Sequence, residues 1–245
     1  MRALLPDPVD NPDLHDWYGR GWLDDGGVRV NFIVSADGGV SVAGRSRGLQ
    51  TPGDNRVFAV LRDLADVVLV GSGTARAEGY SAVKPDARRA AARRQHGLAA
   101  ALPVAVVSRS LELDPASALF TRAQRGARTI VVTCAAAPGD RRRELSEAAD
   151  VLVAGTETVD LADAVAQLAA RGLRRVLCEG GPSLFRDLVS AGVASEICLT
   201  VSPLLAGPGS GRIVAGSPWP DGAQRLRLAG LLEEEGALFC RYRLG

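Results

Sequence analysis

Short apolar runs alternate with amphipathic stretches along most of the chain. In residues 55–65 the apolar side chains recur at helical spacing, at Val57, Val60, Leu61 and Leu64, which predicts a helix with one buried face. Short apolar runs between turn-forming residues predict buried strands. We expect helices over residues 55–65, 85–95, 140–149, 161–170 and 182–191, and strands over 28–35, 67–70, 103–107, 128–133, 151–154, 174–178, 196–201, 226–232 and 238–243.

This alternation predicts an α/β fold with a mostly parallel sheet and antiparallel strands at its C-terminal end. Residues 1–27 are rich in proline, aspartate and glycine, so we expect an irregular N-terminal arm whose aromatic side chains pack on the body. Residues 28–245 contain no convincing boundary and are expected to form a single domain. Asp54 is the expected N-cap of the helix over 55–65.

The composition narrows the possible functions. The chain has 245 residues, 47% of them hydrophobic, and a net charge of +1, as in ordinary globular proteins. Such a charge gives no general attraction to nucleic acid or anionic membranes, and no apolar run reaches the roughly 18–20 residues of a membrane span. We therefore expect neither partner, and a cytoplasmic location. The four cysteines and two histidines are isolated in sequence, so we expect reduced, buried cysteines and no metal site.

Turn-forming residues directly follow four of the expected strands. These turns cover residues 36–39, 71–74, 108–110 and 179–181. If the strands are parallel, the four turns lie along one edge of the sheet, and open α/β sheets bind ligands beyond the carboxyl ends of their strands. We therefore expect one ligand site built from these turns.

The turn at 179–181 has the most specific pattern. Gly180 and Gly181 let the backbone approach a ligand without a Cβ in the way, and Pro182 suits the first turn of the following helix. The free amides of that turn attract anions together with the helix dipole, and Glu179 stands just before them. This pattern predicts a nucleotide cofactor beside a reacting group. The alternative is a tight strand–helix connection whose glycines serve packing.

The other candidates carry weaker signals. The turn at 71–74 is not the dinucleotide fingerprint, because Arg76 stands where the third glycine belongs. Arg109, between two serines, suits a monoester phosphate such as the 2′-phosphate of NADPH, with a solvated arginine as the alternative. Arg62 either binds a substrate phosphate or faces solvent, and both interpretations stay open. Of 29 basic residues only Lys84 is a lysine, which indicates either a specific need for lysine or chance.

Acidic side chains near the expected site are Asp37, Glu78 and Glu179. The two isolated histidines suggest no Ser–His–Asp arrangement. Hydride transfer would need little covalent help from these groups, because the cofactor carries that chemistry and the protein supplies position and electrostatics.

The ordered set of motifs resembles one known family. The matching segments are Ser35-Ala36-Asp37-Gly38, Gly71-Ser72-Gly73-Thr74 followed by Glu78, Ser108-Arg109, Glu179-Gly180-Gly181-Pro182-Ser183-Leu184, and Ala191-Gly192-Val193 through Pro203-Leu204-Leu205-Ala206-Gly207. Over roughly residues 28–243 the chain resembles the reductase domain of the bifunctional riboflavin-biosynthesis deaminase/reductase, which has a dihydrofolate-reductase-like fold.

The resemblance implies a three-layer αβα sandwich, a homodimer, and NADPH-dependent reduction of a phosphoribosylamino-pyrimidine at C1′. By position it assigns to NADPH the residues Val34, Gly71, Thr74, Glu78, Ser108, Arg109, Gly180, Gly181, Pro182, Ser183, Leu184 and Phe185. It assigns to the substrate Asn31, Ser46, Arg62, Lys84 and Glu179, with Arg62 and Lys84 as candidate phosphate ligands. Candidates for proton transfer are Glu78, Glu179 and a bound water.

Several functions stay open at this point. The zinc-deaminase signature of the bifunctional relatives does not occur, so we expect a stand-alone reductase. Its substrate is 5-amino-6-(5-phosphoribosylamino)uracil or the diamino precursor of that compound, and the sequence does not decide between them. A dihydrofolate or pterin reductase, and a regulator that binds NADPH without catalysis, are the competing hypotheses.

Overall fold

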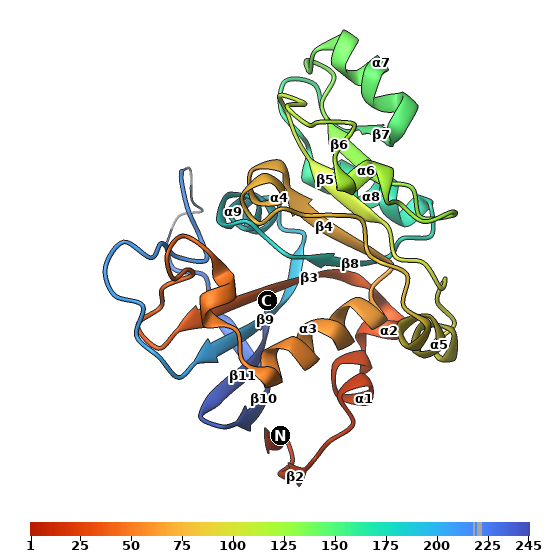
Figure 1. Ribbon diagram of the computed structural model, residues 1–245. Coiled ribbons are helices and arrows are strands. Elements are labelled where there is room, and N and C mark those ends of the chain that lie inside the picture. Colours follow the sequence, from red (N-terminus) through yellow and green to blue (C-terminus); the bar gives the residue numbers. More distant parts are fainter. Residues whose placement is uncertain (218, 220–221) are drawn as a thin grey trace.

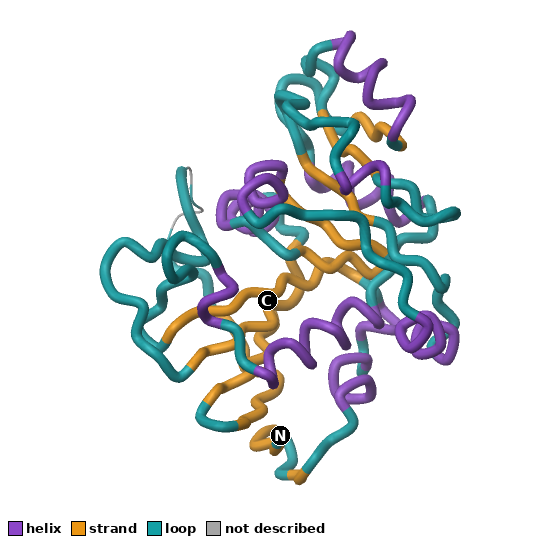
Figure 2. The backbone as a smooth tube through the Cα atoms, viewed as in Figure 1, coloured by secondary structure: helices purple, strands orange, loops and turns teal. Residues whose placement is uncertain are grey.

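The strands form a single mixed sheet with helices on both faces (Figures 1 and 2). The computed structural model describes residues 1–217, 219 and 222–245. Its strands are β1 (Arg2–Leu5), β2 (Val9–Asp10), β3 (Gly27–Ser35), β4 (Val67–Gly71), β5 (Val104–Val107), β6 (Ile130–Thr133), β7 (Asp150–Val153), β8 (Arg175–Cys178), β9 (Ala194–Ser202), β10 (Leu226–Glu234) and β11 (Ala237–Leu244). Its helices are α1 (Leu14–Gly19), α2 (Trp22–Asp25), α3 (Pro52–Leu64), α4 (Ser72–Ala77), α5 (Ala87–Gln95), α6 (Ala118–Thr121), α7 (Gly139–Ala148), α8 (Leu161–Ala170) and α9 (Pro182–Ser190), with a short 3₁₀ turn at Ser46–Leu49.

The strand order confirms the expected sheet. It runs β2-β1-β10-β11-β9-β3-β8-β4-β5-β6-β7. From β9 to β7 all neighbours are parallel, whereas β11, β10, β1 and β2 add antiparallel pairs at the other end. The antiparallel part includes the C-terminal strands, as the sequence predicts.

Alternation of side chains along the strands builds two cores, one on each face of the sheet. In β4, Val68 and Val70 pack with the apolar face of α3, whereas Val67 and Leu69 belong to the cluster that α8 and α9 cover. Two helical layers around one sheet make the predicted three-layer αβα sandwich.

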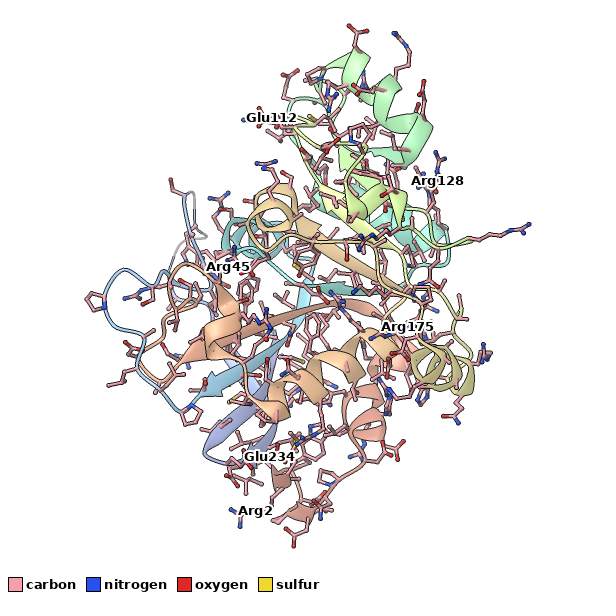
Figure 3. All side chains as sticks on the ribbon, in the orientation of Figure 1. Arg2, Arg45, Glu112, Arg128, Arg175 and Glu234 are labelled. Carbon is pink, nitrogen blue, oxygen red and sulfur yellow. The ribbon has the colours of Figure 1, made fainter. Side chains whose placement is uncertain are left out.

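The N-terminal residues depart from the expected irregular arm. They form β1, β2, α1 and α2, and β1 joins the main sheet beside β10. Arg2 and Glu234 lie at this end of the sheet in Figure 3. The expected packing of the aromatic side chains is confirmed, because Trp17, Tyr18 and Trp22 are buried. Residues 1–27 therefore contribute strands to the sheet and aromatic side chains to one core.

Helix α3 begins earlier than expected, and Asp54 is not its N-cap. Thr51 caps the helix, with its hydroxyl oxygen accepting the amide hydrogen of Asp54 at 3.1 Å. Pro52 then occupies the first turn, where its missing amide hydrogen costs nothing. Asp54 instead lies inside that turn with 5% of its surface exposed.

Strands β3, β8, β4 and β5 are parallel neighbours, so their carboxyl ends share one edge of the sheet. The four turns singled out in the sequence follow these strands, and the structure confirms their common edge. The four cysteines are buried and unpaired, as expected. Among the described helices, none is long and apolar enough to cross a membrane.

Candidate active site

Two adjoining cavities open at the carboxyl edge of the central strands. The first, here called the inner cleft, has a volume of about 360 Å³ and lies between β3, α3, α4 and the turn before α9. The second, the outer cleft, has about 590 Å³ and lies between α3, the segment 78–86 and α5. Both are lined by Ser46, Gln50, Phe58, Glu78 and Tyr80, so they form one continuous hollow.

The turn before α9 is built from glycines because no side chain fits there. Gly180 has a φ of +89°, the left-handed region that favours glycine, and the Gly180–Gly181 peptide bond is cis. Its carbonyl oxygen accepts the amide hydrogen of Gly71 at 2.9 Å, which joins the turn to the end of β4. A Cβ on Gly181 would lie 2.2 Å from Thr74 Oγ1. The backbone therefore comes close to α4, which brings the turn and Thr74 together.

The first turn of α9 leaves backbone donors free. Gly181 is the N-cap and makes no side-chain capping bond, and Pro182 follows it. Among the hydrogen bonds of the described residues, the amides of Ser183 and Leu184 donate to no protein acceptor. Free amides and the positive end of the helix dipole together favour a negatively charged ligand group.

Glu179 is the centre of a buried polar cluster. Arg62 Nε donates to Glu179 Oε1 at 2.7 Å, and Arg62 Nη2 donates to Oε2 at 2.7 Å. Tyr80 donates its hydroxyl hydrogen to Oε2 at 2.8 Å. Arg62 also stacks on the ring of Phe58, with Cζ 4.3 Å from the ring centroid. Three elements, α3, β8 and the segment after α4, are thus tied together at one carboxylate.

Burial and neighbouring charges determine the protonation states of Arg62 and Tyr80. Burial raises the pKa of Tyr80 well above its usual value, and the neighbouring charge of Glu179 raises it further. Burial acts to lower the pKa of Arg62, but attraction by Glu179 and the hydrogen bonds to it outweigh that effect, so the pKa lies above the usual range. Arg62 stays charged and Tyr80 stays protonated around neutral pH, and both remain donors to Glu179.

Asp54 is a second buried acid that faces the inner cleft. Burial raises the pKa of its carboxyl group, and a hydrogen bond from Thr200 partly opposes the shift. No cationic side chain of the described residues forms an ion pair with it. Sequence reasoning missed this role because an aspartate at the start of a helix is a common N-cap; Thr51 just before Pro52 was the available sign of another cap.

The clefts bring together many of the residues that the resemblance indicates. The inner cleft is lined by the predicted residues Asn31, Ser46, Thr74, Glu78, Glu179, Gly181 and Pro182. The outer cleft is lined by the predicted residues Ser46, Arg62, Glu78 and Lys84. Tyr80 and Arg89 also line the clefts and were missed, because nothing in the local sequence indicates that they meet the other groups in space.

Arg109 lies apart from these clefts, in a third cavity of about 680 Å³ beside α9. Leu184 also lines this cavity, as do Arg186 and Asp187. Arg109 is exposed and follows β5, which is separated in the sheet from β8, the strand that precedes Glu179, by β4. An extended ligand could span the inner cleft, the first turn of α9 and this cavity.

Other predicted residues do not line any of these cavities: Val34, Gly71, Ser108, Gly180, Ser183 and Phe185. Ser108 is 3% exposed, and its hydroxyl oxygen accepts the amide hydrogen of Leu111 at 3.0 Å. Phe185 packs on Phe32 in the core, with ring centroids 5.5 Å apart. Ser108 and Phe185 therefore have structural contacts of their own, whereas Ser183 is exposed.

Asp37, one of the acids expected near the site, binds a loop instead. Its carboxylate accepts the amide hydrogens of Ala206 and Gly207 at 3.0 and 2.8 Å. Hydrogen bonds from Ser35 and from these amides lower the pKa of Asp37 to about 2. Its oxygens are occupied by the loop, and the acids that line the inner cleft are Asp54, Glu78 and Glu179.

Comparison with known proteins shows the family of the chain. The sequence profile of the RibD C-terminal domain matches residues 27–234. The chain belongs to this family. A 2,5-diamino-6-ribosylamino-4(3H)-pyrimidinone 5′-phosphate reductase of Archaeoglobus fulgidus is 31% identical over 181 residues, which cover 74% of this chain and 81% of the relative. The reductase of the same name from Methanothermobacter thermautotrophicus is 29% identical over 202 residues, 82% of this chain and 89% of the relative.

Solved structures show the same fold. A pyrimidine reductase-like protein of Corynebacterium diphtheriae superimposes with a TM-score of 0.84 at 27% identity, covering 96% of this chain and 99% of that one. The RibD protein of Acinetobacter baumannii gives a TM-score of 0.67 at 18% identity, and covers 90% of this chain but 58% of its own. The RibD-type reductase fold therefore spans nearly the whole chain.

Proposed function

We propose that this RibD-family chain uses NADPH to reduce C1′ of a phosphoribosylamino-pyrimidine to the ribityl product. The observation that carries the proposal is the buried Glu179–Arg62–Tyr80 cluster, which stands between an anion-binding helix terminus and a basic cleft. A bound NADPH supplies the hydride. The names of the relatives support the substrate class.

The residues present fit a dinucleotide phosphate. The free amides of the first turn of α9 suit its pyrophosphate, and the missing Cβ of Gly181 lets this turn lie directly against Thr74. Arg109 lines the third cavity, and among the described residues its guanidinium forms no ion pair, so it can bind a monoester phosphate, which supports NADPH over NADH. We propose that Thr74, Gly181 and Arg109 hold the cofactor.

Opening of the ribose ring needs a proton at its ring oxygen before C1′ can accept hydride. Glu78 suits this step, because its carboxylate is exposed at the junction of both clefts. It accepts a single backbone hydrogen, from Ser46 at 3.2 Å, so it can exchange a proton with solvent. Glu179, with both oxygens already accepting from Arg62 and Tyr80, is better suited to orient the sugar hydroxyls.

Asp54 supports the diamino form of the substrate over the uracil form. A buried carboxylate without a cation needs hydrogen-bond donors. A 2-aminopyrimidinone edge offers donors at its amino group and ring N–H, whereas the uracil form places a carbonyl oxygen where that amino group stood. The curated relatives carry names that specify the diamino form. We propose that Asp54 binds the amino edge.

The sheet also offers a surface for a second copy of the chain. Leu226 and Leu228 of β10 expose 43% and 38% of their surface. Their partners across the strands are Leu244 and Tyr242 of β11, so the four apolar side chains share one face. We propose a homodimer through this face. Leu228→Glu should halve the mass measured by sedimentation, and an unchanged mass would place any contact elsewhere.

Turnover tests the proposed function directly. NADPH oxidation would be followed with the diamino substrate, its uracil counterpart and dihydrofolate offered separately. The expected result is turnover of the diamino form, with lower kcat/KM for the uracil form and none for dihydrofolate. Turnover of dihydrofolate alone would move the protein to folate reduction. NADPH binding without any turnover would support the non-catalytic regulator.

A further inference from the structure

The outer cleft carries more positive than negative charge. Arg62, Lys84 and Arg89 line it, against the carboxylates of Glu78 and Asp86. Asp86 is the N-cap of α5 and accepts the amide hydrogen of Arg89 at 2.8 Å, whereas Glu78 accepts a backbone amide at 3.2 Å. Three cationic side chains face two carboxylates, so the outer cleft favours a negatively charged ligand group.

Arg62 is the least available of the three cations. Two of its nitrogens donate to Glu179 at 2.7 Å, and its guanidinium plane stacks on Phe58. A planar fork that is already matched to a carboxylate cannot offer the same pair of donors to a phosphate. Arg62 is therefore a positioning residue for Glu179.

Arg89 also donates to a carboxylate, but through Nε, so its two terminal nitrogens remain available to a ligand. Its Nε donates to Asp63 Oδ1 at 3.2 Å, and the contacts of the described residues give its two terminal nitrogens no protein acceptor. Asp63 is fully buried on α3 and also accepts from His15 Nε2 at 3.1 Å. The Arg89 side chain is 16% exposed. A buried carboxylate thus fixes the stem of the guanidinium at the wall of the outer cleft.

Lys84 is a phosphate ligand that the resemblance already implies. We propose that Arg89 joins it in binding the phosphate monoester of the substrate, and that Asp63 positions Arg89. The proposal rests on the proposed function for the identity of the substrate. The two clefts share a wall that includes Glu78 and Tyr80, so a pyrimidine in the inner cleft can place its sugar at the junction and its phosphate in the outer cleft. A forked arginine beside a point-charge lysine suits a dianion.

Binding of two compounds to the 245-residue chain without NADPH tests this assignment without requiring turnover. The probes are the ribitylamino-pyrimidine 5′-phosphate and the same compound without its phosphate, titrated by calorimetry. Arg89→Gln should weaken binding of the phosphorylated compound roughly 10- to 100-fold, as loss of a charged hydrogen bond predicts, and leave the dephosphorylated compound unchanged. Lys84→Gln, at an exposed position, should show the same selectivity.

The matched control is Arg88→Gln. Arg88 also contacts Asp63, at 3.3 Å, but its side chain is 61% exposed and does not line the outer cleft. This variant should keep both affinities. Arg62→Gln should weaken both compounds by the same factor, because its effect passes through Glu179.

Two outcomes would overturn the assignment. One is a wild-type protein that binds both compounds equally, and the other is an Arg89→Gln variant that changes neither affinity or both by one factor. If Arg89→Gln does not fold, Arg89→Lys keeps the charge and should give a smaller loss confined to the phosphorylated compound. Failure of the proposed function is seen separately, as binding selectivity without turnover of either pyrimidine.

Discussion

The pairing of Arg62 with Glu179 can be measured as a coupling free energy. The perturbations are Arg62→Gln, Glu179→Gln and the double variant, with stability read from urea unfolding. The Glu179 side chain is 2% exposed and that of Arg62 is 19% exposed. Removing one partner of a buried pair costs about 3–5 kcal/mol, and the partial exposure of Arg62 lets solvent reduce this, so we expect about 2–3 kcal/mol for Glu179→Gln.

The double variant should lose less than the sum of the two single losses. Two charged hydrogen bonds of good geometry predict a coupling of about 1.5–3 kcal/mol. A surface pair provides the control: Arg128 and Asp150 are 3.2 Å apart with 45% and 51% of their side chains exposed, and Arg128 projects from the edge of the molecule in Figure 3. That pair should couple by less than about 1 kcal/mol. An Arg62–Glu179 coupling no larger than the control would refute the buried cluster as the organiser of the site.

Three further predictions address the inner cleft and the cofactor site. Burial raises the folded-state pKa of Asp54, so the contribution of its carboxyl group to stability is present below the unfolded pKa of about 3.9 and is lost as the pH rises through the folded pKa. Asp54→Asn should therefore be more stable than wild type at neutral pH. A gain in stability that persists below about pH 4 would contradict this. Arg109→Gln should weaken NADPH by about 1.5–3 kcal/mol in a fluorescence titration and leave NADH unchanged, whereas equal losses would remove Arg109 from the 2′-phosphate. Gly181→Ala should weaken NADPH binding and lower the Tm, because its Cβ would lie 2.2 Å from Thr74 Oγ1. Gly73→Ala, with no atom within 4 Å, should change neither, and equal behaviour of the two variants would remove the Gly181–Thr74 contact from the cofactor site.

The sequence was sufficient to predict the common edge of the sheet. The runs that end at Val70, Val107 and Cys178 are short and apolar, and each passes directly into turn residues, which locates the strand ends to within a residue or two. Parallel pairing then followed from the alternation with helices. Local pattern sufficed here because both the strands and the turns are determined by neighbouring residues.

Local sequence patterns do not predict contacts between residues that are far apart in the chain. Arg62 and Glu179 are 117 positions apart, and nothing local shows that they meet. Met1 pairs its amino group with Glu234, and β1 pairs with β10, so the order of the N-terminal residues depends on strands from the other end of the chain. The prediction that Asp54 is an N-cap was wrong for a related reason. Thr51 and Asp54 are both suitable N-cap residues, and only the fold shows that Thr51 caps the helix while Asp54 is buried.

Isotope transfer tests the central claim most directly. The protein would be supplied with the phosphorylated diamino-pyrimidine and with NADPH that carries deuterium at both positions of C4 of the dihydronicotinamide. The product would be examined by NMR and mass spectrometry. The account predicts one deuterium per molecule at C1′ of a ribityl chain. A pyrimidine product without deuterium at C1′, or oxidation of NADPH that leaves the ribosyl group intact, would contradict it.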